Sequence, residues 1–186
     1  MQIKQLNVSY LTEQDRILIR VNTSDSQEFL LWLTRRMTIQ FWPAFQKSIL
    51  ELDNARVGTA SASASARKAY SEFEREKSLR DVKLGTAYDA ANVKHPLGAE
   101  PLLVTSIDLT PSGNSQQLHI RWTERLPDAP ASRSFELNLQ PNMYHGLAHL
   151  FENGLQASLW REQEMGLALS KAEAPATSAE QRRYLN

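Results

Sequence analysis

Cysteine is absent from the 186 residues of this chain, which excludes disulfide bonds, thiolate metal ligands and cysteine nucleophiles. Glycine is scarce, with seven residues, and the sequence holds no glycine-rich phosphate-binding loop, nucleophile elbow or calcium-binding loop. These absences lower the expectation of catalysis. We therefore expect no cofactor and favour a protein that is not an enzyme.

An excess of charge of either sign is also missing, because 21 basic residues are matched by 21 acidic ones. A strongly basic surface of the kind that coats duplex DNA is thereby excluded. No apolar run approaches the roughly 20 residues that cross a bilayer, and the first residues do not open a signal-peptide pattern. We expect a cytoplasmic protein that makes no membrane contact.

What the sequence does contain is a pattern of three strands followed by a helix. Apolar and polar residues alternate in three successive segments, as expected of strands with one buried face. These segments are 2–11, 16–22 and 28–33. At Thr34, a predicted N-cap, the apolar period lengthens to that of a helix. Pro43 lies inside this helix and predicts a kink or a break just before it.

The same pattern returns in the second half of the chain. Strand alternation is found again in three segments, which are 102–110, 118–124 and 134–139. A helix follows from Pro141, whose missing N–H suits a first helical position, to about residue 162. The first of these strands is expected to bury Leu103, Thr105, Ile107 and Leu109.

Together these patterns predict an α+β fold of pseudo-duplicated β-β-β-α units, with antiparallel sheets and helices packed on one face. The units are expected at 1–53 and 102–162, with Phe29 and Phe135 at equivalent positions. We expect each sheet to bury its apolar face against the helix of its own unit.

The segment 54–101 between the two units differs from both in composition. A run of alanine and serine at 58–66 predicts a linker or a frayed helix start, and the charge-rich residues 67–83 predict a helix with a narrow apolar line. The loop at 84–101 completes this insertion. The last residues, 163–186, are predicted to form a disordered tail, so that the chain makes one compact domain overall.

The outward faces of the two predicted sheets differ. The first carries large apolar side chains beside an arginine, which is the composition of an interaction surface. Its outward residues are Leu18, Arg20, Leu30 and Trp32. With Arg121 from the second sheet, they form the predicted surface for a protein partner or for self-association. The alternative is that the middle helix or the other unit covers these side chains.

Two other groups of residues are candidate sites. Arg35 and Arg36 follow the predicted N-cap, where cations and free backbone N–H groups can hold a phosphate or carboxylate; a solvated or salt-bridged arginine pair is the alternative. His145 and His149 are spaced i, i+4 on the last helix, with Glu152 beyond them. This spacing predicts a half-site for zinc or another divalent ion, or else a polar helix face.

Three functions follow from these features. The first is a non-catalytic binding or scaffold protein of unknown specificity that acts through an exposed sheet face. The alternative is a single-stranded nucleic-acid-binding protein, because arginine and aromatic side chains on a sheet can stack bases. That arrangement is similar in outline to the PUR and Whirly proteins, whose repeats carry four strands each. The third is a metal-dependent enzyme.

Overall fold

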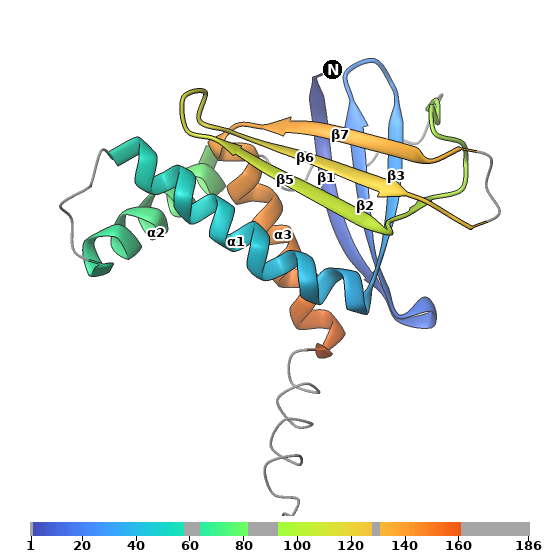
Figure 1. Ribbon diagram of the computed structural model, residues 1–186, viewed down its shortest axis with the longest axis horizontal. Coiled ribbons are helices and arrows are strands. Elements are labelled where there is room, and N and C mark those ends of the chain that lie inside the picture. The colour runs from blue at the N-terminus through green and yellow to red at the C-terminus, as the bar shows by residue number, and fades with distance from the viewer. Residues whose placement is uncertain (1, 58–63, 82–92, 128–130, 161–186) are drawn as a thin grey trace, which may run out of the picture.

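The computed structural model describes residues 2–57, 64–81, 93–127 and 131–160. These residues form two sheets with helices below them, which confirms the predicted α+β class (Figure 1). The predicted tail at 163–186 lies outside the described residues. Within the described part, no helix has the length and apolar character that crossing a membrane requires.

The first sheet has the order β1-β2-β3-β4, with its first three strands antiparallel and β4 parallel to β3. Its strands are β1 (Ile3–Leu11), β2 (Arg16–Thr23), β3 (Glu28–Thr34) and β4 (Leu102–Leu103). The predicted alternation is confirmed, because Ile17, Ile19 and Val21 have no exposed surface while the residues between them are half-buried. A 3-10 turn at Thr12–Gln14 joins β1 to β2.

The second sheet is a fully antiparallel meander of three strands, in the order β5-β6-β7. Its strands are β5 (Ser106–Ser112), β6 (Gln117–Glu124) and β7 (Arg133–Leu139). The side chains of Leu118, Ile120 and Trp122 are completely buried, as the sequence alternation predicts. The opposite face of this sheet is polar.

The prediction of one strand over 102–110 is wrong, because the chain changes sheet within it. Leu102 and Leu103 pair with β3, and β5 starts only at Ser106. Leu102 and Val104 are buried instead of the predicted Leu103 and Thr105. The carboxylate of Glu124 holds this crossing by accepting the Leu103 N–H at 2.8 Å and a hydrogen bond from Arg133. That bond from Arg133 lowers the pKa of Glu124.

The helices are α1 (Arg35–Val57), α2 (Ala64–Asp81) and α3 (Pro141–Ser158). Thr34 caps α1 as predicted, since its Oγ1 accepts the Met37 N–H at 3.3 Å. The helix is not broken at Pro43. Burial of apolar residues on both sides of the proline offsets the roughly 3 kcal/mol that it costs. Helix α3 ends at Ser158, and the predicted end at about residue 162 lies outside the described residues.

Each long helix packs mainly on the sheet of the other unit, which corrects the expectation that each unit is self-contained. Helix α3 lies on β1, and α1 lies on β5. The C-terminal end of α3 is fixed to the β1–β2 turn, where the Trp160 Nε1–H donates to Asp15 at 2.7 Å and the indole contacts Tyr10. The second half has one strand more than the first, because β4 pairs with the first sheet before β5 begins, and a common origin for the two halves stays a hypothesis.

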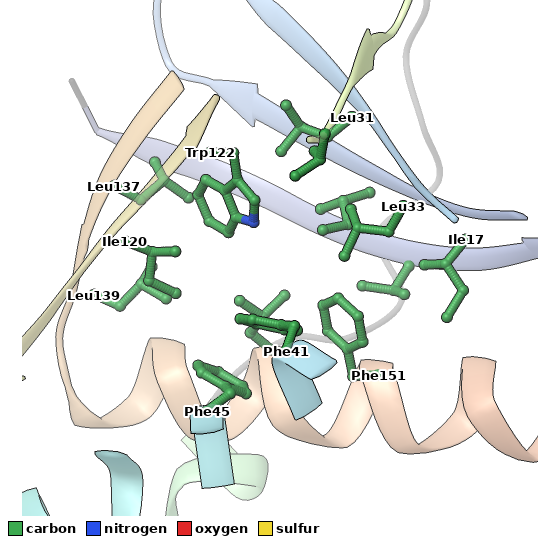
Figure 2. Packing of buried hydrophobic residues seen from close by; sticks show 14 of the residues in the cluster. Ile17, Leu31, Leu33, Phe41, Phe45, Ile120, Trp122, Leu137, Leu139 and Phe151 are labelled. Carbon is green, nitrogen blue, oxygen red and sulfur yellow. The ribbon is translucent and has the colours of Figure 1, made fainter. Parts of the chain in front are cut away.

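The two sheets and the two helices share one hydrophobic core. Phe29 and Phe135, predicted to be equivalent, stack on each other with ring centroids 4.3 Å apart. Figure 2 shows Leu31, Leu33, Trp122 and Leu137 converging from the two sheets onto aromatic side chains below. Those aromatic residues are Phe41, Phe45 and Phe151 of α1 and α3. The chain is therefore interlocked rather than built from two independent halves.

We expect Gly154→Leu to destabilise the protein by about 1 to 3 kcal/mol, because it overpacks the contact between α3 and the first sheet. A Cβ at Gly154 would lie 3.4 Å from a methyl group of Val8, with Ile17 also in contact. Gly113→Leu is the matched control, since Gly113 is exposed and its Cβ would meet only Ala55 at an ordinary 3.7 Å. Urea unfolding of both variants measures the difference; equal stabilities would contradict the close approach.

Helix α2 begins three residues before the helix predicted at 67–83, and its narrow apolar line makes little contact with the rest of the fold. Phe73 is 60% exposed. Polar contacts hold the helix instead, from Ser71 to Asp53 and from Arg75 to Glu152. The helix packs on α3 and α1, away from the first sheet (Figure 1).

Candidate functional site

The predicted apolar surface lies on the face of β2 and β3 that points away from the core. Leu18 is directly opposite Trp32 in the register of the two strands, and Arg20 is opposite Leu30. All four side chains are half-buried by their neighbours on the same face. Leu103 of β4 extends this row next to Trp32. We call Arg16, Leu18, Arg20, Leu30 and Trp32 the outer face.

The charges on the outer face are placed around its apolar centre. The Arg16 guanidinium lies 4.9 Å from the centroid of the Trp32 ring, a cation–π contact. Arg20 is 3.1 Å from the carboxylate of Glu28, which is almost fully buried. The His95 ring lies 3.6 Å from the other oxygen of that carboxylate. The outer face therefore combines aliphatic and aromatic surface with one neutralised and one stacked arginine.

Neither of the two expected covers lies on the outer face. Helix α2 packs on α3 and α1, and the second sheet meets the first on its inner side through Phe29 and Phe135. Among the described residues, the short strand β4 lies at the edge of the face next to Trp32, and His95 lies beside Glu28, beyond Leu30. In the part of the chain that the structure describes, the apolar side chains of the outer face are therefore not part of the shared core.

Arg121 does not join the outer face. It lies on the outward side of the second sheet, across the shared core, and its Nε is 2.6 Å from Glu136. His119 contacts the same carboxylate at 3.2 Å. The hydrogen bond from Arg121, with a smaller effect of His119, lowers the pKa of Glu136. These three exposed side chains form a separate polar cluster.

Arg35 and Arg36 start α1 as predicted, and the structure separates their surroundings. Arg36 is exposed, whereas Arg35 is half-buried. Arg35 lies near Tyr10: a hydrogen bond to Asp15 raises the pKa of the Tyr10 hydroxyl, and the charge of Arg35 acts in the opposite direction. One backbone donor of the helix start is already used by Thr34. Anion binding by this pair stays a prediction.

The three predicted metal ligands do not face one point. His145 is buried and its Nε2 lies 3.3 Å from Asp53. Glu152 is bound by Arg75, and His149 contacts Asn153. Within the part of the chain that the structure describes, no group of three histidine or acidic side chains is arranged to hold a metal ion.

A buried polar cluster joins α1, α2 and α3, and its centre is Asp53, which the sequence analysis did not single out. The Asp53 carboxylate accepts from Ser71 at 2.6 Å and lies 3.3 Å from both Tyr144 Oη and His145 Nε2. No sequence motif marks it, since its partners are 18 to 92 residues away. Only the arrangement of the three helices brings them together.

A pocket of about 280 Å³ lies beside this cluster, lined by Trp42, Ile49, Arg75, His145 and Glu152 among others. The polar groups are mutually satisfied, because Ser71 donates to Asp53 and Arg75 pairs with Glu152. Ser71 donates to the aspartate rather than to His145, so the histidine is not placed to activate it as a nucleophile. The cluster therefore ties the helices together.

Comparison with known proteins found no matching family model, no matching curated protein and no matching solved structure.

Proposed function

We propose that this chain is a non-catalytic binding protein that takes up a partner protein on its outer face. The observation that supports the proposal is the adjacency of Leu18, Leu30 and Trp32 on two paired strands, on the side away from the helices. Tryptophan and arginine are enriched at the energetic centre of protein interfaces, and adjacent apolar side chains on a surface mark interaction sites. No membrane-crossing helix occurs in the described ranges.

The charges favour a protein over a nucleic acid. Arg20 is neutralised by Glu28, which leaves Arg16 as the cation beside the apolar centre. Binding a phosphate backbone draws on several unneutralised cations. A protein segment with apolar side chains next to one carboxylate would match the outer face: its apolar groups would cover Leu18 and Leu30, and its carboxylate would meet Arg16.

Trp32→Ala tests the proposal, with Arg121→Ala on the opposite sheet as the matched control. The purified full chain is used to capture proteins from native cell extract, and any stoichiometric partner is purified and titrated by calorimetry. We expect Trp32→Ala to weaken that partner at least about tenfold and Arg121→Ala to leave it unchanged. Circular dichroism should show both variants folded, because both side chains lie outside the core.

The same titration is made with a fluorescent 30-residue oligothymidylate at two salt concentrations. We expect little binding. Tight oligonucleotide binding that falls steeply with salt and is lost in Trp32→Ala would replace the proposal with the nucleic-acid alternative. A partner protein bound equally well by Trp32→Ala would place its site elsewhere and contradict the proposal.

A further inference from the structure

The exposed sheet edges differ in how well they are protected against pairing with another strand. Proteins usually shorten such edges or place proline and charged residues on them. Strand β4 has two residues, β5 contains Asp108 and Pro111, and β7 contains Arg133 and Glu136. Strand β1 is nine residues long and has a single charge, Lys4, near its start.

The stretch of β1 from Leu6 to Leu11 is regular as well as uncharged. Its pairing with β2 is irregular only between Ile3 and Gln5, so the rest of the strand pairs with β2 in a continuous antiparallel register. No described strand pairs with its other side. Helix α3 contacts the inner face of the strand, where Gly154 lies against Val8.

The inner side chains at this edge are incompletely covered. On the neighbouring β2, Ile17 and Ile19 are fully buried, whereas Leu6 and Tyr10 of β1 remain half-buried at the border of the core. A further strand beside β1 would cover them. The side chains needed for this contact are apolar and alternate with a period of two, which is the pattern a pairing strand requires.

We propose that β1 pairs with β1 of a second copy of this chain, antiparallel and with Val8 on the two-fold axis. This register places Tyr10 opposite Leu6 on the inner face and Asn7 opposite Ser9 on the outer face. Aromatic–aliphatic and polar pairs in these positions stabilise antiparallel ladders. The self-complementary sequence of the strand thus suits a symmetric interface. The two sheets become one, and their outer faces lie on the same side.

Asn7 and Ser9 supply a test of this register, because both point away from the core and face each other only in the dimer. Asn7→Asp combined with Ser9→Asp places like charges opposite each other twice across the axis. Asn7→Asp combined with Ser9→Lys places opposite charges there and shares the first substitution. Ser106→Asp with Thr110→Asp on β5 is the control, since it adds the same charge to another edge at exposed positions.

Sedimentation equilibrium of the full chain measures the result. We expect the unmodified chain to have twice the 21.1 kDa mass of one chain. The double aspartate should raise the dissociation constant about tenfold, the Asp/Lys variant should restore dimerisation, and the β5 control should dimerise normally. Thermal unfolding confirms that the variants are folded.

Three results would overturn the proposal. The first is an unmodified chain that is still monomeric at about 100 μM, a concentration at which a specific edge pairing would associate. The second is a dimer whose dissociation constant does not change in the double-aspartate variant. The third is an Asp/Lys variant that stays monomeric. The proposal does not depend on what the outer face binds, because Trp32→Ala leaves β1 untouched. Loss of partner binding and loss of the dimer are therefore separable.

Discussion

Asp53→Ala is expected to destabilise the protein by about 3 kcal/mol. The carboxylate is buried and has three close partners, the Ser71 hydroxyl, the Tyr144 hydroxyl and the His145 ring. Removing it takes the acceptor away from the buried His145 ring and breaks the contact with the Tyr144 hydroxyl, and an unsatisfied buried polar group costs roughly 1 to 3 kcal/mol. Urea unfolding followed by circular dichroism measures the loss.

Two matched variants show whether the loss of stability comes from buried hydrogen-bond donors that have lost their acceptor. Ser71→Ala removes one donor and leaves the aspartate with Tyr144 and His145, so we expect a loss of only about 1 kcal/mol. Asp53→Asn keeps an acceptor oxygen and should lie between the two. If Asp53→Ala were as stable as Ser71→Ala, the cluster would not hold the three helices together.

A chain that ends after Val57 is expected not to fold, although it contains β1, β2, β3 and α1. In the full chain the inner face of β1 packs on α3, and α1 packs on β5. Without those partners Ile17, Leu31 and Phe45, which have no exposed surface in the full structure, would face water. Burial of such side chains contributes about 1.5 to 3 kcal/mol each. We expect the cooperative thermal transition to be lost entirely.

Circular dichroism during heating and the dispersion of amide proton signals check this result, with the full chain as the reference. Residual helix in α1 would not count as folding, because an isolated helix melts without a sharp transition. A cooperative transition in the fragment would show that the first β-β-β-α unit is self-contained, and that the crossing of the helices adds little to its stability.

Local patterns predicted the strands and helices because those elements depend on residues close in sequence. The two-residue alternation at Ile17, Ile19 and Val21 was sufficient to assign their buried side, since a strand turns successive side chains to opposite faces. Thr34 was recognised as a cap for the same reason, as capping is a contact over three residues. The prediction of a single strand over 102–110 was wrong because the passage of the chain from one sheet to the other leaves no local signal in the sequence.

The candidate surface was predicted in part. Leu18, Leu30 and Trp32 were placed together correctly by alternation and by the expected pairing of neighbouring strands. Arg121 was wrongly grouped with them, because the residue pattern within a strand does not show how two sheets are placed relative to each other. Arg16 was missed, although it has the same parity as Leu18; its position over Trp32 could have been found by extending the pattern by one residue pair.

By itself the sequence determined which segments are strands and helices and which side of each is apolar, with the strand predicted at 102–110 as the exception. Only the tertiary structure decided that α1 and α3 each pack on the sheet of the other half and that Asp53 contacts Ser71 and His145. It also decided that β1 lies at the edge of its sheet. Secondary structure is set by interactions over a few residues, whereas each of these features joins residues far apart in the chain. The free energy gained by burying apolar side chains decides between such arrangements. It depends on the buried area and has no preferred direction, so the sequence pattern does not show which elements pack together.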